Sequence, residues 1–211
     1  MIGESLNQPT SHSNSDARAQ DQTRPAAASV DRIGGLFLWL DEREIRLIRL
    51  VLINQTRSPK LAAINAFINS LGNGWIYFVA GLLLVYFKRR KSVRVILAAA
   101  LSIAIAHLLF YPWIKSLLAR LRPFDLDPAL KPRVKCLDEY SCPSGHMMTA
   151  IAFGIPLGYA FPGTLPVIGL CLLVIAWSRL ALAHHYPTDL ILGGVIGAAI
   201  ATPITMLIFK G

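Results

Sequence analysis

The segment from Val95 to Ile114 is twenty residues long and contains no Asp, Glu, Lys or Arg. Because an α-helix rises about 1.5 Å per residue, a segment of this length reaches across the roughly 30 Å hydrocarbon core of a bilayer. The segment therefore predicts a membrane-spanning helix. A chain that contains such a helix folds in a membrane, so we expect its other apolar segments to be helices of the same kind.

The rest of the chain repeats this apolar character. Hydrophobic residues make up 54% of the sequence and charged residues 16%, whereas about a quarter of the residues in soluble domains are charged. Four further segments have the composition of spans: residues 75–87, 147–161, 165–183 and 190–209. In the last of them, Gly193, Gly197 and Ala201 recur every four residues and predict a smooth face for close helix packing. We predict an all-α fold, an integral membrane bundle of about five transmembrane helices.

The N-terminal part has a different composition. Residues 1–32 are polar, with no apolar core, and predict a disordered tail. In residues 33–60 the apolar side chains follow one helical face and charged ones crowd the others, which indicates an amphipathic segment in the membrane interface. Residues 61–211 then form the membrane domain, which opens with a short amphipathic stretch that carries Asn65 and Asn69 on its polar side.

The basic residues predict the orientation of the bundle. Residues 88–94 hold five Lys or Arg and no acid, which is typical of a cytoplasmic loop. The loop over residues 115–145 and the junction over residues 183–189 then face the other compartment. The C-terminus lies inside and, with five spans, the N-terminal tail lies outside. The outer loop is also rich in cations, which conflicts with this rule unless several of them bind a ligand. The net charge of +9 does not indicate nucleic acid, because no soluble basic domain carries it.

Two clusters of candidate functional residues border the outer loop. Lys115 and Arg122 are seven residues apart, so both project from one face of a helix that ends after Arg122. They are either interfacial anchors or ligands of an anion. Ser144 is a natural N-cap for the next helix, and Gly145 lets an anion approach the exposed N–H groups of the first turn. His146 would lie beside that anion.

A third cluster lies before the last span. Arg179 approaches the outer end of the preceding span, and Pro187 suits the first turn of the last one. Asp189 follows His185 by four residues, and a carboxylate there can hold the imidazole in one tautomer, with the other nitrogen free as nucleophile or base. Three cations, a helix N-terminus, two histidines and a carboxylate match the charge of a transferring phosphoryl group. No cluster of carboxylate, Cys or His ligands indicates a metal, so the cations would replace one.

In these three clusters the sequence resembles the membrane type-2 phosphatidic acid phosphatase family. The family pattern is a Lys, six residues and Arg-Pro; then Pro-Ser-Gly-His; then Ser-Arg, five residues, His, three residues and Asp. The chain contains all three parts in order. The resemblance implies that His185 attacks phosphorus, that Asp189 orients it and that His146 protonates the leaving oxygen. It further implies, without any cofactor, that the phosphoryl oxygens are held by Lys115, Arg122, Ser144, Gly145 and Arg179.

The resemblance also implies a substrate class. The short chain, the five predicted spans and the external site are similar to the bacterial undecaprenyl-diphosphate phosphatases of this family. This favours a membrane lipid phosphate or diphosphate as substrate, in the bacterial cytoplasmic membrane, with the site facing the periplasm or the cell exterior. Dephosphorylation of phosphatidylglycerophosphate, phosphatidic acid or lipid A stays open, as does phosphotransfer to an acceptor other than water. A membrane scaffold or transporter is the non-enzymatic alternative, although it requires none of the three catalytic residues.

Three residues outside the clusters carry predictions of their own. Cys136 and Cys142 lie six residues apart in the outer loop, where they form a disulfide or remain two free thiols. His107, in the middle of the span over residues 95–114, is predicted to hydrogen-bond a neighbouring helix rather than to take part in catalysis. The sequence makes no prediction of oligomeric state.

Overall fold

Helices make up most of the described chain. The computed structural model describes residues 37, 39–51, 58–72, 74–127, 129–130, 134, 136 and 138–210, and of residues 87–90 the backbone alone. A helix over residues 39–51 is followed by α3 (Pro59–Leu71), α4 (Trp75–Ile105), a π-helical turn η1 (Ala106–Phe110), α5 (Tyr111–Leu118), α6 (Pro123–Leu126), α7 (Gly145–Ala160), a 3₁₀ turn η2 (Pro162–Thr164), α8 (Leu165–Ala181) and α9 (Pro187–Lys210). No strand occurs in these ranges, and the predicted all-α fold is confirmed. The predicted tail, residues 1–32, lies outside them.

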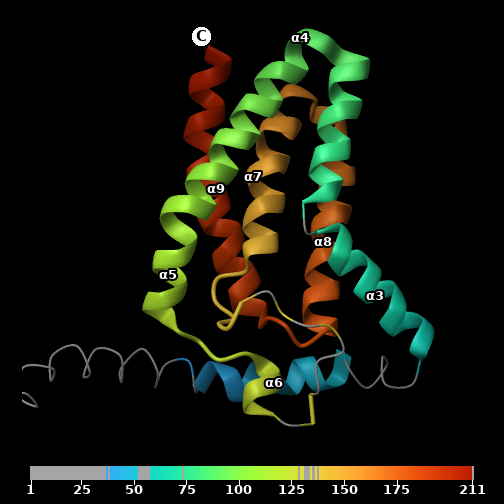
Figure 1. Ribbon diagram of the computed structural model, residues 1–211, viewed down its shortest axis with the longest axis vertical. Coiled ribbons are helices and arrows are strands. Elements are labelled where there is room, and N and C mark those ends of the chain that lie inside the picture. The colour runs from blue at the N-terminus through green and yellow to red at the C-terminus, as the bar shows by residue number, and fades with distance from the viewer. Residues whose placement is uncertain are drawn as a thin grey trace, which may run out of the picture. The chain divides into compact units, whose positions relative to one another are not determined.

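The first predicted span is one arm of α4, which folds back on itself. The second predicted span begins in the other arm of α4 and continues through η1 into α5. The Ser92 hydroxyl donates to the carbonyl oxygen of Leu84, eight residues earlier, at 2.5 Å. In a straight α-helix these residues would lie about 12 Å apart along the axis, so the chain reverses between them. Figure 1 shows this turn at the end of the bundle that also holds the C-terminus. The basic segment over residues 88–94 is part of the turn.

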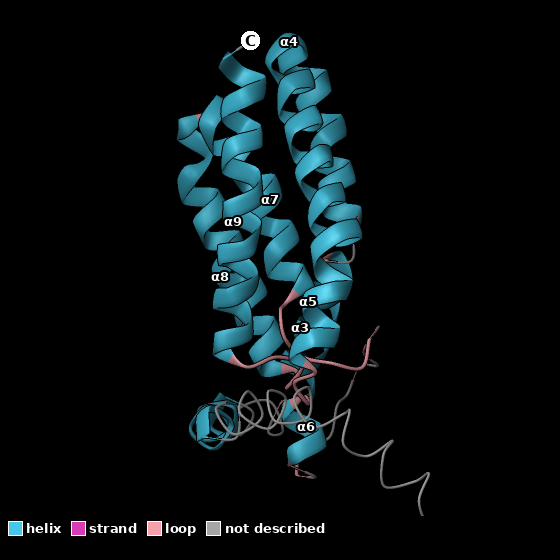
Figure 2. Ribbon diagram, turned by 90° about the vertical axis from the view of Figure 1, so that its left-hand side faces the viewer, coloured by secondary structure: helices cyan, strands magenta, loops and turns pink. Residues whose placement is uncertain are grey.

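Among the described residues, length and composition allow three helical segments to cross a membrane, namely Lys91–Leu126, Pro162–Ala181 and Pro187–Lys210. A fourth crossing results if α3 and the first arm of α4, bent by 59° from one another, form one span. The remaining predicted span, residues 147–161, is α7, whose sixteen residues extend about 24 Å. Because α7 contacts α4, α8 and α9, it is an inner helix of the bundle (Figure 2). The count of five spans stays a prediction.

The packing of α7 on α9 fixes where α7 begins. A Cβ atom at Gly193 would lie 2.5 Å from the backbone oxygen of Ser144, and one at Gly197 would lie 2.6 Å from that of Met148. Only glycine permits such an approach, so the predicted smooth face of the last helix is confirmed. The Ser144 N–H also donates to the backbone oxygen of Asp189, at 3.1 Å. The N-termini of α7 and α9 are thereby held side by side.

Apolar side chains cover the outside of the bundle, while polar ones gather within it. Leu173 is 69% exposed and Leu207 75%. Several charged or polar side chains, by contrast, are almost fully buried: Lys115, Arg120, Arg122, Ser144, Arg179, His184, His185 and Asp189. This distribution is that of a protein surrounded by lipid, where buried ionisable groups mark functional sites. The predicted membrane class is confirmed.

The helix over residues 39–51 belongs to the same compact unit as the bundle, and this unit comprises Trp39–Gly211. Ile48 is fully buried in a cluster that includes Tyr186. Asp41, seven residues earlier, is buried as well, so the packed face of this helix is not formed by apolar side chains alone. Asp41 is buried beside an ion-pair partner from a distant part of the chain, Arg120.

Candidate active site

The three predicted clusters meet at one end of the bundle. They lie at the end of α5 and in the loop after it, at the start of α7, and between α8 and α9, which Figure 1 shows converging at the end opposite the C-terminus. An open cavity of about 550 Å³ lies there. Of the predicted site residues, those that line it are Arg122, Gly145, His146, Arg179 and His185. The other three, Lys115, Ser144 and Asp189, are buried in the protein around it.

His185 is held in one tautomer by two neighbours. Its Nδ1 lies 2.7 Å from the backbone oxygen of Ser141, and its Nε2 lies 3.2 Å from Nη2 of Arg179. A carbonyl oxygen only accepts and a guanidinium only donates, so the proton is on Nδ1 and the lone pair on Nε2. Burial, and after it the charge of Arg179, lower the pKa of the His185 imidazole well below its ordinary value. The site therefore presents a neutral imidazole with an unprotonated Nε2 at the cavity.

Asp189 differs from its predicted arrangement. Its Oδ2 lies 3.7 Å from Nδ1 of His185, beyond hydrogen-bonding distance, and accepts instead from the N–H of Tyr186 at 2.9 Å. Its Oδ1 accepts from Arg120 at 2.6 Å. The predicted i, i+4 pairing thus brings the two side chains close, but the carbonyl of Ser141 takes the hydrogen bond because Asp189 is engaged by other donors.

Arg179 is fixed by an asparagine of α3. Its Nη1 donates to Oδ1 of Asn69, and the neighbouring Ser178 hydroxyl donates to the backbone oxygen of Asn65 at 3.0 Å. Both asparagines are buried, so the polar side of the predicted amphipathic stretch faces α8. This contact holds the guanidinium against His185.

Lys115 and Arg122 converge on one carboxylate, Asp138. The Lys115 ammonium lies 2.8 Å from its Oδ2, and Arg122 pairs with its Oδ1. The Tyr111 hydroxyl donates to Oδ2 at 2.5 Å. Burial by itself raises the pKa of the Asp138 carboxyl, but the hydrogen bonds from Lys115 and Tyr111 outweigh it and lower that pKa to about 2. Two predicted phosphate ligands therefore hold a permanently charged anion at the cavity.

The helix predicted to carry both cations is shorter than expected. α5 ends at Leu118 because Ala119 adopts a left-handed conformation, with φ 41°, and its N–H donates to the backbone oxygen of Lys115. Arg122 lies beyond this break, before α6. The prediction of one helical face through both cations is therefore wrong, and the loop rather than the helix brings Arg122 toward Lys115.

The start of α7 has the predicted cap. Ser144 is the N-cap, and its hydroxyl accepts from the N–H of Met147 at 3.5 Å. A Cβ atom at Gly145 would lie 3.0 Å from the Tyr111 ring, so glycine here makes room for that ring. The imidazole of His146 lines the cavity, and a Cβ atom at Gly72 would come within 2.6 Å of it. The bend between α3 and α4 is thus shaped around His146.

The sequence interpretation missed four residues that build the site: Asn69, Arg120, Ser141 and Asp138. Ser141 acts through its backbone oxygen, for which no side-chain pattern gives a signal. Asp138 is one of several acids in a loop rich in cations, and its neighbours do not indicate which cations it pairs with. Arg120 could have been found from the sequence, because it lies between Lys115 and Arg122 in the first cluster.

The remaining candidates lie nearby. His184 Nε2 contacts the backbone oxygen of Val134 at 3.0 Å, and burial, with Arg179 next in effect, lowers the pKa of His184 to about 3. Cys136 and Cys142 are free thiols, which is the second of the two predicted alternatives, and burial raises the pKa of the Cys142 thiol.

His107 Nε2 lies 2.7 Å from the Thr149 hydroxyl of α7, which confirms the predicted hydrogen bond to a neighbouring helix. Within the described residues, no group of three or more His, Cys, Asp or Glu side chains is arranged to hold a metal ion.

A helical membrane bundle with a neutral histidine, a second histidine and buried cations around one cavity has the groups that a membrane-embedded phosphatase requires. The sequence profile of the PAP2 superfamily matches residues 91–210, more than half of the chain. The chain therefore belongs to the PAP2 superfamily.

One protein of similar sequence and two solved structures of similar fold are related to this chain. The chain is similar to the undecaprenyl-diphosphatase of Sulfolobus acidocaldarius, with 28% identity over 152 residues, 71% of this chain and 72% of that protein. Its fold is similar to the first transmembrane PAP2 type phosphatidylglycerolphosphate phosphatase from Bacillus subtilis, with a TM-score of 0.60, 18% identity, and 86% of this chain and 96% of that one covered. Aquifex aeolicus LpxE gives a TM-score of 0.55, 21% identity, and 80% and 95% covered. At these identities the two structures establish the fold.

Proposed function

We propose that the protein hydrolyses a lipid diphosphate, undecaprenyl diphosphate in the first place, to the lipid monophosphate and inorganic phosphate, through a phosphohistidine on His185. The observation that carries the proposal is the fixed tautomer of His185. With Nδ1 donating to Ser141 and a lowered pKa, Nε2 holds a lone pair at the cavity. A neutral imidazole positioned in this way is a nucleophile that needs no separate base.

The reaction has two steps. In the first, the lone pair of His185 Nε2 forms a bond to the terminal phosphorus, and the bond from that phosphorus to the bridging oxygen breaks. His146, which lines the same cavity, donates a proton to the departing oxygen of the lipid monophosphate. In the second, water attacks the phosphohistidine, the N–P bond breaks, and His146 takes the proton of that water. The products are the lipid monophosphate and inorganic phosphate.

The phosphoryl oxygens are proposed to take the place of Asp138. Lys115 and Arg122 both pair with its carboxylate, and Arg179 directs Nη2 toward His185. A phosphoryl group carries the same sign of charge and offers more acceptor oxygens than a carboxylate, so it competes for these donors. The N–H groups at the start of α7, with Ser144 and Gly145, add the positive end of a helix dipole.

A lipid substrate is supported by a second cavity. An apolar cavity of about 320 Å³ lies between the two arms of α4, where Tyr77 and Phe153 line it. Ile103 lines both this cavity and the one that contains His185. A lipid whose phosphate lies beside His185 can therefore extend its tail along apolar side chains. The undecaprenyl group is the choice that the Sulfolobus acidocaldarius relative favours.

The location proposed for the site is the outer face of the cytoplasmic membrane of a bacterium. The site lies at the end of the bundle opposite the α4 turn, and the sequence of that turn holds the five basic residues that mark a cytoplasmic loop (Figure 1). A fluorescent protein fused to the C-terminus tests this, because it fluoresces only in the cytoplasm. Fluorescence is expected.

The first experiment is phosphate release in detergent with EDTA, from undecaprenyl diphosphate, phosphatidylglycerophosphate, phosphatidic acid and lipid A. We expect the wild type to release phosphate fastest from undecaprenyl diphosphate, and His185→Ala to lose activity by at least about 10³-fold. His184→Gln is the matched variant, because His184 is the adjacent buried histidine and contacts Val134 rather than Arg179. Acid-free trapping with labelled substrate should give phosphohistidine in the wild type and in His184→Gln.

Three outcomes would contradict the proposal. Activity that survives in folded His185→Ala excludes His185 as the nucleophile. A strong preference for phosphatidylglycerophosphate, phosphatidic acid or lipid A replaces the proposed substrate but keeps the mechanism. No release from any lipid by folded wild type, together with a stable phosphohistidine, indicates transfer to an acceptor other than water.

A further inference from the structure

Arg120 is a buried cation that the proposed reaction does not use. The residue is 2% exposed and does not line the cavity of His185, although Arg122 and Arg179 do. Its guanidinium lies 2.6 Å from Asp41, 2.8 Å from Glu44 and 2.6 Å from Asp189. We call Arg120 with these three carboxylates and Thr188 the Arg120 cluster.

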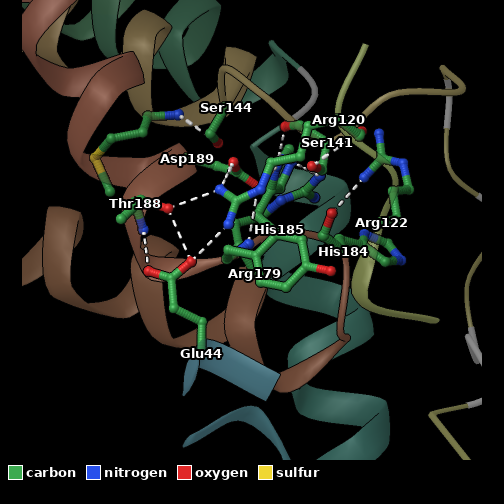
Figure 3. A network of polar contacts seen from close by, with 12 residues as sticks. Glu44, Arg120, Arg122, Ser141, Ser144, Arg179, His184, His185, Thr188 and Asp189 are labelled. Atoms are coloured by element: carbon green, nitrogen blue, oxygen red, sulfur yellow. Dashed lines mark hydrogen bonds and ion pairs between the residues drawn. The ribbon is translucent and has the colours of Figure 1, made fainter. Parts of the chain in front are cut away.

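The cluster joins the helix over residues 39–51 to the first turn of α9, directly after the loop that carries His185. Figure 3 shows Glu44 reaching Arg120 and Thr188. Glu44 accepts from the Thr188 N–H at 3.0 Å and from its hydroxyl at 2.8 Å, and Arg120 donates to the same hydroxyl at 2.7 Å. The start of α9 is therefore held by residues that do not line the cavity.

The backbone of Arg120 reaches His185 by a second route. Its carbonyl oxygen accepts from the N–H of Ser141 at 2.8 Å and from the Ser141 hydroxyl at 3.2 Å. The carbonyl of Ser141 in turn holds Nδ1 of His185. One residue thus fixes both the peptide that sets the His185 tautomer and, through Asp189, the start of the helix that follows His185.

The charges of the cluster make this arrangement depend on the helix over residues 39–51. Asp189 engages one side of the guanidinium, through Nη1, while Asp41 and Glu44 engage the other, through Nη2. The ring of Tyr186 lies 3.9 Å from the guanidinium carbon and closes one face. With its donors directed on both sides, the guanidinium has a single orientation.

We propose that Arg120, held by Asp41 and Glu44, is a positioning residue for His185, so that the amphipathic helix over residues 39–51 is a part of the catalytic site. This rests on the proposed role of His185 as the nucleophile. Neutralising one acid loosens the guanidinium and shifts the loop. A misplacement of about 1 Å in a reacting group can cost up to about 10²-fold in rate.

The test compares Glu44→Gln with Glu42→Gln. Both remove one negative charge from the same helix, but Glu42 is exposed whereas Glu44 contacts Arg120 and Thr188. We expect Glu44→Gln to lower kcat about ten-fold or more, while the inhibition constant of inorganic phosphate changes by less than about two-fold. The phosphate ligands lie outside the cluster, which is why binding is spared. Glu42→Gln should behave as the wild type.

The outcomes are separable. If folded Glu44→Gln keeps the kcat of Glu42→Gln, or loses phosphate affinity and kcat together, the positioning role is overturned. Should Glu44→Gln fail to fold, Asp41→Asn replaces it, because Arg120 then keeps Glu44 and Asp189. His185→Ala is measured alongside: if it stays active, the proposed function fails, whatever the Glu44 variants do.

Discussion

Arg120 and Arg122 lie two residues apart in one loop, and each is 2% exposed. The guanidinium of Arg120 pairs with three carboxylates, two in the helix over residues 39–51 and one at the start of α9. The guanidinium of Arg122 pairs with one carboxylate, Asp138, in a loop at the cavity. The charge of Arg120 is thus more than matched by permanent partners, while the partner of Arg122 is partly exposed and can be replaced. The number and fixity of acidic partners, rather than burial, distinguish a structural arginine from one that is available to a substrate anion.

The sharpest test of this comparison replaces each arginine by glutamine. Arg122→Gln should lower kcat/KM by about 10²–10³-fold, because a donor to the developing phosphoryl charge is lost, and should weaken inhibition by inorganic phosphate. Arg120→Gln should leave phosphate inhibition unchanged but lower the melting temperature more, since three carboxylates, two of them buried, lose their cation. Steady-state kinetics and thermal denaturation in detergent measure both. An identical response of the two variants would remove the distinction.

The glycine at the end of α3 tests how closely the cavity is built around His146. Gly72→Ala places a methyl group 2.6 Å from the imidazole, whereas Gly169→Ala places one where no atom lies within 4 Å. We expect Gly72→Ala to lower kcat about ten-fold, because the proposed acid is displaced, and Gly169→Ala to have no effect. Equal kcat values for the two variants would show that His146 relaxes into free space without cost.

Removing the negative charge of Asp138 should strengthen phosphate binding, whereas the loss of Arg122 weakens it. Asp138→Asn frees Lys115 and Arg122 of a competing charge, so inorganic phosphate should inhibit more strongly, by roughly two- to five-fold, the range of a partly exposed ion pair. Glu139→Gln, one residue away, is the matched control and should not change phosphate inhibition. Weaker inhibition in Asp138→Asn would mean that Asp138 positions the two cations instead of occupying their site.

The smallest expected effect is on the pH dependence of chemical modification: His185 should remain reactive at acidic pH. Its pKa is lowered, so the neutral form remains as pH falls through the ordinary histidine pKa. Carbethoxylation requires the neutral imidazole, and the rate at His185, followed by mass spectrometry, should stay constant down to about pH 5.5. A free histidine with a pKa of about 6.5 would retain about a tenth of its reactivity there. The same decline at His185 would contradict the lowered pKa.

The sequence was informative wherever a short local pattern sets the structure. The uncharged run from Val95 predicts a helix by its length alone, and Ser144 predicts a cap because capping depends on adjacent residues. The glycines of α9 predict close packing for the same reason. The three clusters could also be assigned to one end of the bundle, since the order and orientation of successive spans determine which loops share a side.

Local patterns failed where the decisive partner is distant in the chain. The helical face through Lys115 and Arg122 was predicted wrongly because Ala119 breaks the helix, and nothing in its neighbours announces a left-handed residue. The burial of Asp41 had no local signal, because its partner Arg120 is 79 residues away. The hydrogen bond of His185 went to a carbonyl of the outer loop rather than to Asp189.

The sequence by itself determined the class of fold, the family motifs and the set of residues that can handle a phosphoryl group. These follow from hydropathy, helix geometry and side-chain chemistry, which depend on composition and short spacing. Only the tertiary structure decided which arginine faces the cavity, which atom fixes the imidazole and that Asp138 holds two cations. Those outcomes depend on the directions of side chains from segments far apart in sequence, because hydrogen bonds and buried ion pairs form only within about 3 Å.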